Sequence, residues 1–414
     1  MPLTIHARGV TDIGRRRKVN EDSLLVVPEL GLFAVADGMG GHSAGEVASA
    51  RAVEVAHAFI AERAQILRDF AEDPTPDRGA AAARLVEQAV QAACADIFRM
   101  AARDVRLHGM GTTFVCLVVA GDRGVVAHVG DSRLYLARRG HVHLLTEDHT
   151  LIAEQIKAGE LKPEDAGKSP FKGVLTRALG AHESVQVDTL VVDLLAGDTL
   201  LLCSDGLYGY FSDADLVQRF AAGVTETLAA EMVSHANERG GRDNITAIVV
   251  SAADSGADEQ SSLSRIDALR RVSLFEHLTY REQNELLAVA HTRSYAAGDV
   301  LVREGEPGGD LYVVLDGEVS IEQQGLPIAA VGAGGHIGEM GLVDAGPRSA
   351  SVRARTPIRA MVISREDMLS VMQRWPTLAV KLLWAFVQVL SQRLRAANTE
   401  LSGALAGPET TRLG

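Results

Sequence analysis

Hydrophobic and polar positions follow two different patterns along the chain. Up to about residue 250, short apolar runs typical of β-strands are separated by turns and by two long amphipathic segments. Apolar residues recur every three or four positions over 43–69 and 80–103, which predicts helices there. From residue 265, short strands and glycine turns alternate at close intervals, and two further helices are expected over 365–374 and 376–398.

These patterns predict two folded domains. For residues 1–252, roughly ten strands and two long helices favour an α+β sandwich with the sheets inside and the helices outside. For residues 265–398, the regular spacing of short strands predicts a small barrel or jelly roll. Residues 253–264 are polar and without apolar rhythm, which predicts a linker, and residues 399–414 are expected to form a disordered tail.

Composition narrows the class of protein. The formal net charge of −13 argues against a nucleic-acid partner. No apolar run reaches about 18 residues, so no membrane span is expected. The chain does not start like a signal peptide, and its three cysteines are spaced like buried free thiols rather than metal ligands. A cytoplasmic location is therefore predicted.

Four aspartates stand at predicted strand ends beside glycine: Asp37, Asp131, Asp205 and Asp243. Alone, Asp37 with the following Gly38, Gly40 and Gly41 predicts a turn with positive φ. Four such carboxylates in one domain favour a site for a hard divalent cation, Mg²⁺ or Mn²⁺. The lack of paired His and Cys ligands argues against zinc.

The order of several motifs then resembles the metal-dependent protein phosphatases of type 2C, in their bacterial form, over about residues 4–252. The matching residues are Asp12, Arg17, Asn20-Glu21-Asp22, Asp37-Gly38-Met39-Gly40-Gly41-His42, Gly111-Thr112-Thr113, Gly130-Asp131-Ser132-Arg133, Ser204-Asp205-Gly206 and Asp243-Asn244. The resemblance implies a four-layer α-β-β-α sandwich with a two-metal Mn²⁺ or Mg²⁺ centre. It also implies hydrolysis of phosphoserine and phosphothreonine in proteins.

The same resemblance implies individual metal ligands. Asp37 would bridge both metals, and Gly38 would give its backbone carbonyl to one of them. Asp205 and Asp243 would bind the other metal, and Asp131 would join Asp205 at a third, weaker site.

Further roles follow from the resemblance around these ligands. Glu21 and Asp22 would hold metal-bound waters, and Arg17 would grip the substrate phosphate. Residues 148–180 resemble the flap beside the active site, on which we interpret His149 as structural.

One position departs from the pattern of animal members of the family. They carry a histidine, thought to be a general acid, directly after the Asp-Gly pair, and Met39 stands there in this chain. His42 follows three residues later, either as an acid or as a packing residue of the helix start. The proton donor to the leaving group therefore stays open.

The second domain has its own candidate site. Gly338-Glu339 opens a short helical turn, and Arg348 follows where it can clamp a phosphate. With Gly305, Gly308 and the run 310–319 before it, this region resembles a cyclic nucleotide-binding domain over about 270–395.

That resemblance also implies ligand contacts. Glu339 would bind the ribose 2′-hydroxyl and Arg348 the cyclic phosphate, with amides near Gly338 and Ala350 completing the phosphate site. The first residue of the family's motif is commonly Phe, and His336 stands at that position in this chain. Ser349 is a hydroxyl that can contact guanine, but bacterial domains with Ser or Thr there also take cyclic AMP, which the resemblance slightly favours.

The sequence thus predicts a phosphatase regulated by cyclic AMP or cyclic GMP, acting on kinase substrates or on the kinase itself. The last helix, with Trp384 or Phe386 facing the base, would cover the nucleotide or pair with another chain. Two alternatives stay open. The first domain would be a pseudophosphatase scaffold, or the second would only dock a partner protein.

Overall fold

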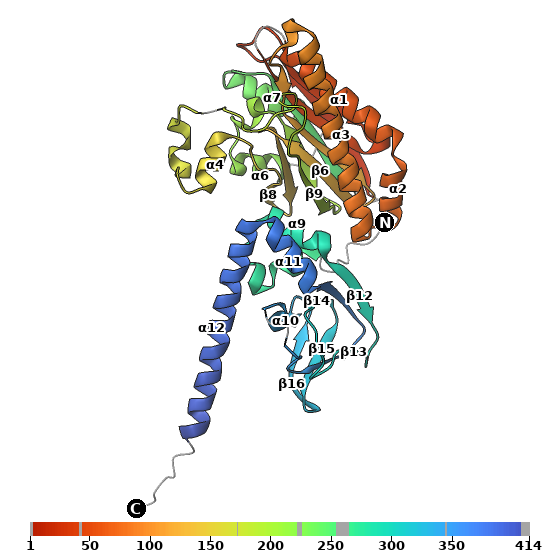
Figure 1. Cartoon of the computed structure of the whole chain (residues 1–414), viewed down its shortest axis with the longest axis vertical. Helices are drawn as coiled ribbons and strands as arrows, with labels where there is room; N and C mark the ends of the chain where they lie inside the picture. The colour runs from red at the N-terminus through yellow and green to blue at the C-terminus, as the bar shows by residue number, and fades with distance from the viewer. Residues whose placement is uncertain are drawn as a thin grey trace, which may run out of the picture. The chain divides into compact units, whose positions relative to one another are not determined.

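A computed structural model of the chain describes residues 3–40, 44–171, 173–221, 226–253, 265–343 and 346–406. The chain divides into two compact units, Met1–Asp258 and Glu259–Gly414 (Figure 1).

Two antiparallel sheets form the centre of the first unit. The first sheet has the order β1-β11-β10-β7-β8 and consists of β1 (Thr4–Asp12), β11 (Ile245–Ala253), β10 (Thr199–Cys203), β7 (Arg133–Arg138) and β8 (His141–Leu144). The second has the order β2-β3-β5-β6-β9, with β4 paired to β3, and consists of β2 (Asp22–Val27), β3 (Leu32–Met39), β4 (Gly111–Thr112), β5 (Phe114–Ala120), β6 (Arg123–Val129) and β9 (Asp188–Asp193). Most residues of the central strands are buried, because each sheet is covered on both faces.

Helices cover the outer face of each sheet (Figure 1). The second sheet packs against α1 (Gly45–Glu62), α2 (Gln65–Glu72) and α3 (Pro76–Arg103) through one continuous apolar core. The first sheet packs against α5 (Asp205–Tyr208), α6 (Asp213–Ala221) and α7 (Leu228–Glu238) through another. Shorter helices are η1 (Pro28–Leu30), η2 (Val105–Leu107), α4 (Leu151–Lys157) and η3 (Pro163–Lys168). The four-layer α-β-β-α order that was expected is confirmed.

The single helix predicted over 43–69 is wrong, because the structure has two helices there. The chain turns at Arg63, whose backbone N–H bonds to the carbonyls of Ile60 and Ala61. This turn lets Ile60 on α1 and Phe70 on α2 enter the same core, which one straight helix would not allow.

The second unit contains two four-stranded sheets with helices beside them. One sheet has the order β12-β19-β14-β17, with β12 (His291–Tyr295), β19 (Ile358–Ile363), β14 (Leu311–Asp316) and β17 (His336–Ile337). The other has the order β13-β18-β15-β16, with β13 (Val300–Val302), β18 (Ser351–Ala354), β15 (Glu318–Gln323) and β16 (Leu326–Gly332). Residues of both sheets share one apolar core, which confirms the predicted small β-jelly roll. The helices are α8 (Arg265–Arg270), η4 (Ser273–Phe275), α9 (Tyr280–Val289), α10 (Glu339–Val343), α11 (Arg365–Arg374) and α12 (Pro376–Ala406).

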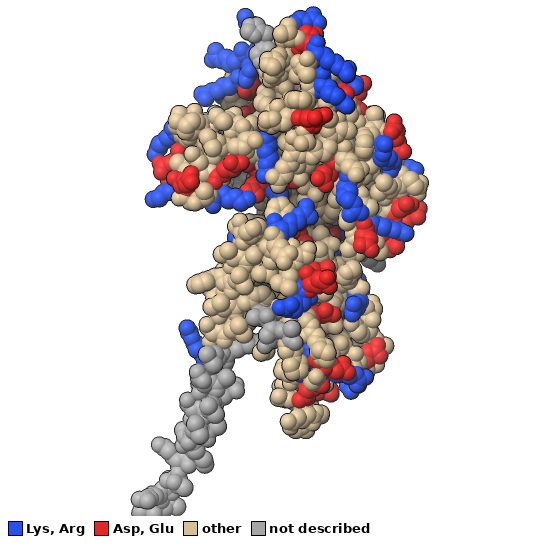
Figure 2. Space-filling model, viewed as in Figure 1, with Lys and Arg blue, Asp and Glu red and all other residues tan. Residues whose placement is uncertain are grey.

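One expectation about α12 is wrong. It continues to Ala406, so residues 399–406 are helical rather than a disordered tail. Its apolar residues also divide between two faces: Leu382 and Phe386 are buried, whereas Trp384 is 61% exposed and Leu383 is exposed beside it. Figure 2 shows a largely uncharged surface over this part of the helix. Among the residues that the structure describes, the helices lack the combination of length and apolar character that a membrane span needs.

Candidate functional site

Asp22 and Asp37 lie opposite each other on neighbouring strands of the second sheet. Asp22 begins β2 and pairs in register with Asp37 near the end of β3. Thr113, which directly precedes β5, fixes the backbone of Asp37, because the Asp37 N–H donates to the Thr113 hydroxyl at 2.9 Å. The backbone N–H of Thr113 in turn donates to the Asp37 carbonyl at 2.9 Å. The two carboxylates are therefore positioned by sheet geometry.

Gly38 is a glycine for a different reason from the one that the sequence suggested. It continues β3 and pairs with Thr112, and its φ is not positive. A Cβ at Gly38 would lie 2.1 Å from the carbonyl oxygen of Gly45 and 2.6 Å from that of Glu21. The turn interpretation is therefore wrong for Gly38, which is required because α1 and β3 approach so closely. Gly40 has φ +157°, and Gly41 lies outside the described residues.

The first sheet brings its own carboxylates to the same place. Asp205 begins α5 directly after β10, and Asp243 precedes β11. Hydrogen bonds join these strand ends to Asp22, because the Ser204 hydroxyl donates to Asp22 Oδ2 at 2.8 Å and the Thr246 hydroxyl at 2.6 Å. Asp22 thus connects the two sheets at the point where the carboxylates gather.

The electrostatics of this cluster are unfavourable without a cation. Burial raises the pKa of Asp37 well above its usual value, and the neighbouring carboxylates of Asp22 and Asp205 raise it further. Burial raises the pKa of Asp22 to about 6, against the effect of its hydroxyl donors. Burial, followed by repulsion from Asp205, raises the pKa of Asp131 to about 7. Repulsion between buried like charges is typical of a site that neutralises them with metal.

The donor set fits hard divalent cations. Asp22 Oδ1 and Asp205 Oδ1 are buried and accept no hydrogen bond. Carboxylate oxygens with a nearby backbone carbonyl are the ligands that Mg²⁺ and Mn²⁺ prefer. Within the described parts of the chain, no group of three or more His, Cys, Asp or Glu side chains is arranged so that it could hold a metal ion without some rearrangement.

Arg17 lies at the rim of the cluster. Its guanidinium pairs with Asp243, with Nη2 2.7 Å from Oδ2, and lies 4.0 Å from Glu21 Oε2. Its side chain is 47% exposed, so it is accessible to a phosphate group.

Asn244 is a structural residue of this site to which the sequence pattern assigned no role. Its side-chain oxygen accepts from the backbone N–H of Glu21 at 2.9 Å. Its side-chain nitrogen donates to the carbonyls of Ile13 and Val19, both at 3.0 Å. One buried amide therefore fixes both ends of the loop that carries Arg17. Its position directly after Asp243, at a strand start, was the signal available in the sequence.

His42 and His149 are the two histidines of the first unit for which the sequence suggested roles. His42 lies outside the described residues. His149 is buried and hydrogen-bonded through its ring, in agreement with a structural role. Among the described residues, the structure therefore shows no proton donor at the place of Met39.

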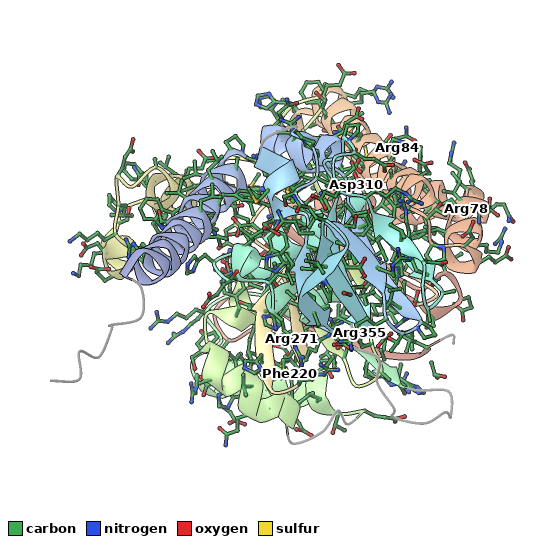
Figure 3. The ribbon with its side chains drawn as sticks, turned by 90° about the horizontal axis from the view of Figure 1, so that it is seen from below. Arg78, Arg84, Phe220, Arg271, Asp310 and Arg355 are labelled. Atoms are coloured by element: carbon green, nitrogen blue, oxygen red, sulfur yellow. The ribbon has the colours of Figure 1, made fainter. Side chains whose placement is uncertain are left out.

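In the second unit, Arg348 and Gly338 come together beside Asp310. Arg348 Nη2 donates to the Asp310 carbonyl at 2.9 Å, and Nη1 donates to the Gly338 carbonyl at 3.4 Å (Asp310 is labelled in Figure 3). Gly338 has φ +88°, and a Cβ there would lie 2.7 Å from Arg348 Nη1. A glycine is needed at this turn for both reasons.

Glu339 follows directly and begins α10. Its side chain is buried, and Oε2 lies 4.0 Å from His336 Nε2. Ser349 is exposed and Ala350 half-buried, just before β18. Trp384 is exposed and Phe386 buried.

Comparison with known proteins identifies both units. Residues 13–239 match the family described as Protein phosphatase 2C, and residues 292–374 match the Cyclic nucleotide-binding domain. The serine/threonine phosphatase stp of Listeria innocua is 39% identical over 250 residues, covering 59% of this chain and 95% of that protein. Protein phosphatase PhpP of Streptococcus pneumoniae is 34% identical over 258 residues, covering 60% of this chain and 98% of that protein.

Solved structures agree with this assignment. The Mycobacterium tuberculosis serine/threonine phosphatase PstP/Ppp superposes with a TM-score of 0.53 at 33% identity, over 60% of this chain and 99% of that one. The catalytic domain of PstP in complex with two manganese ions gives 0.52 at 32% identity, over 61% of this chain and 100% of that one.

Fold and site together define a protein phosphatase domain followed by a second unit that matches the Cyclic nucleotide-binding domain. The chain belongs to the protein phosphatase 2C family, and the predicted enzyme class and domain combination are confirmed.

Proposed function

We propose that this protein is a Mn²⁺- or Mg²⁺-dependent phosphatase that hydrolyses phosphoserine and phosphothreonine in proteins. The observation that carries the proposal is the gathering of buried carboxylates from both sheets, with raised pKa values and unpartnered oxygens, beside an accessible arginine. The names of the relatives and the manganese in the PstP structure support it. The phosphoprotein partners would be kinase substrates or the kinase itself.

The residues around the metals have separate tasks. Asp37 and the Gly38 carbonyl, with Asp205 and Asp243, would hold two cations, and Asp131 with Asp205 a weaker third. Two such ions supply charge stabilisation of the phosphoryl oxygens and lower the pKa of water.

The surrounding residues orient water and substrate. Glu21 and Asp22 would accept hydrogen bonds from water held near the ions. Arg17 leaves its ion pair with Asp243 and binds two phosphoryl oxygens through its planar guanidinium.

The test is hydrolysis of a phosphothreonine peptide by the full chain with Mn²⁺. Turnover should depend on the metal and fall by at least a hundredfold in Asp37→Asn, with folding checked by circular dichroism. Metal-independent turnover, or an Asp37→Asn variant as active as the wild type, would refute the proposal. Complete inactivity of the wild-type chain would instead favour the pseudophosphatase scaffold.

We further propose that the second unit binds cyclic AMP or cyclic GMP and that binding changes the phosphatase rate. The Arg348 side chain reaches the Gly338 carbonyl beside Glu339, as a phosphate and ribose site requires, and the domain matches the nucleotide-binding family. Ser349 and the amide of Ala350 would complete the site. Arg348 would exchange the carbonyls of Asp310 and Gly338 for the anionic phosphate, a stronger acceptor.

Calorimetry with each nucleotide, followed by the peptide assay with and without it, tests this proposal. Arg348→Ala should abolish binding, and Arg355→Ala serves as the control, because that arginine pairs with Glu318 elsewhere in the unit. Binding with unchanged turnover would refute regulation. No heat with either nucleotide would favour a domain that docks a partner protein.

A further inference from the structure

Exposed basic side chains surround the candidate phosphate site of the first unit. Three lie on the loop that carries Arg17 and two on the turn before Asp243: Arg15, Arg16, Lys18, Arg239 and Arg242. We call these five residues the basic rim. Arg17 Nη2 lies 2.7 Å from Asp243 Oδ2, so the two segments meet at the place where the phosphate would bind. The rim therefore adds positive charge beside the site.

Backbone contacts hold the two segments of the basic rim together. The Arg15 N–H donates to the Gly241 carbonyl at 2.7 Å. A Cβ at Gly14 would lie 2.1 Å from the Asp243 carbonyl oxygen, and a Cβ at Gly241 would lie 2.9 Å from the Arg15 nitrogen. The loop and the turn are thus packed backbone against backbone.

Both segments are also anchored to the rest of the unit. Asp12 Oδ1 accepts from the Gly14 N–H at 2.8 Å and from the Asn237 side chain at 3.0 Å. The Tyr210 hydroxyl accepts from the Arg242 N–H at 3.0 Å. Because the rim segments make these bonds through backbone N–H groups, the bonds fix their position without occupying the basic side chains. A charged surface held in place in this way loses little entropy when it binds an anion.

The basic rim differs from the other basic residues of the first unit in its lack of carboxylate partners. Among the described residues, none of its side chains forms an ion pair with Asp or Glu. Elsewhere in the described part of this unit, most Arg and Lys side chains are paired, as Arg51 is with Asp96 and Arg78 with Asp73. The net charge of the chain is −13, so this local excess of positive charge is opposite in sign to the whole protein.

The pKa of His235 reports the sign of the field beside the turn. Burial lowers this pKa, and repulsion from Arg239 and Arg219 lowers it further. Glu238 and Asp215 act in the opposite direction and have the smaller effect. Positive charge therefore outweighs negative charge at this end of α7.

We propose that the basic rim selects phosphoprotein segments in which acidic residues lie within about four positions of the phosphorylated residue. The proposal rests on the proposed function, because it places the substrate phosphate at Arg17. Consecutive Cα atoms are about 3.8 Å apart, and an extended peptide advances about 3.3 Å per residue, so the rim and such acidic residues lie at similar distances from the phosphate. Carboxylates and further phosphate groups are the anions that guanidinium and ammonium groups bind.

A short acidic peptide fits the basic rim better than a long polyanion. The rim is confined to a loop and a turn, and a nucleic acid would continue past it along a chain whose net charge is −13. At about 0.1 M salt, charges more than about 10 Å apart are largely screened, so the rim acts only on groups next to the phosphate.

Two phosphothreonine peptides that differ only in having Glu or Gln around the phosphothreonine test the proposal, with the full chain and Mn²⁺. Exposed ion pairs are individually weak, each changing an equilibrium about 1.5- to 5-fold. Wild-type kcat/KM should be about tenfold higher for the Glu peptide at about 0.05 M salt, and this preference should fall to about twofold or less at about 0.5 M salt. The difference should lie in KM rather than kcat, because the rim does not touch the reacting atoms.

Matched double variants isolate the charge of the basic rim. Arg16→Gln/Lys18→Gln removes two rim charges, and Arg84→Gln/Arg103→Gln removes two exposed charges from α3 as the control (Arg84 is labelled in Figure 3). The rim variant should lower kcat/KM for the Glu peptide about fivefold and leave the Gln peptide within about twofold. The control should equal the wild type with both peptides. Arg242→Gln should lower the Glu preference about twofold from the second segment of the rim.

Equal use of the two peptides by the wild type would overturn the proposal. Equal losses for both peptides in the rim variant would also overturn it, since they would show only a disturbed Arg17 loop. If the double variant does not fold, Arg242→Gln alone decides, and an unchanged Glu preference refutes the proposal. Single-stranded DNA that binds as tightly as the Glu peptide, with binding lost in the rim variant, would assign the rim to nucleic acid instead.

Inactivity of the wild type would refute the proposed function without deciding this proposal. Fluorescence anisotropy with the two labelled peptides on the same chain then provides the test. Binding of the Glu peptide about tenfold tighter than the Gln peptide, with the difference reduced in the rim variant, supports the rim. Equal binding of the two peptides, or no binding of either, overturns it.

Discussion

Replacing Asp22 by Asn should make the metal-free protein more stable at pH 8. Asp22 is buried between the sheets, and its pKa is raised from an ordinary value of 3.8 to about 6. A carboxyl whose folded pKa is raised binds its proton more tightly in the folded chain. Its contribution to stability is therefore complete below about pH 4 and is lost as the pH rises through about 6.

The size of the effect follows from the same difference. A rise from 3.8 to about 6 corresponds to about 3 kcal/mol that the ionised group costs the fold above pH 6. Asn removes that charge and still accepts from Ser204 and Thr246 through Oδ1. For a domain of this size, about 3 kcal/mol raises Tm by about 6–12 °C.

Thermal unfolding in chelator at pH 5 and pH 8 measures both effects. The wild type should be less stable at pH 8 than at pH 5, and Asp22→Asn should remove much of this difference. Asp215→Asn is the control, because Asp215 is only half-buried on α6 and hydrogen bonds from Ser212 lower its pKa. With Mn²⁺ present, the order should reverse, since the wild type gains the ion's binding energy. A metal-free Asp22→Asn variant that melts below the wild type at pH 8 would refute the reasoning.

Three further predictions follow from close packing and buried polar groups. Gly38→Ala places a methyl group against two backbone carbonyls and should lower stability by about 3 kcal/mol or more in urea unfolding, whereas Gly167→Ala, with nothing within 4 Å, should be neutral. Asn244→Ala leaves three backbone groups unpaired and should lower the free energy of unfolding by about 1–3 kcal/mol. The KM for phosphopeptide should also rise, because the loop that carries Arg17 is loosened. An unchanged KM would contradict this role. Asp198→Ala leaves the buried guanidinium of Arg138 without its carboxylate and should cost about 3–5 kcal/mol in the same unfolding assay; a loss below about 1 kcal/mol would contradict it.

The sequence predicted the parts of the site that strand ends determine. Asp37, Asp205 and Asp243 each stand where an apolar run stops or starts, and such positions meet at one end of a sandwich. The role of Asn244 was not predictable in this way, because its three partners lie more than 220 positions away in the chain. Contacts of that kind depend on the completed topology.

The sequence was less informative where two structures satisfy the same pattern. An apolar stripe at helical spacing fits one helix over 43–69 or two helices with a turn at Arg63, and packing of Ile60 and Phe70 decides between them. The same limit applies to α12. It carries apolar residues on both faces, so the pattern does not show which face is buried. Leu382 packs inward because η4 and α11 lie against its side of the helix.

The hydrogen bonds at Asp22 join the two β-sheets where the candidate metal ligands lie, so the first unit resembles a chelating agent in which each sheet is one arm. Ser204 and Thr246 belong to one arm and Asp22 to the other, so the arms are already joined before an ion enters. Rigid arms lose little conformational entropy on ligation, which favours binding. The same rigidity would couple a bound ion to the spacing of the two sheets, so that its loss would affect both sheets rather than a single loop.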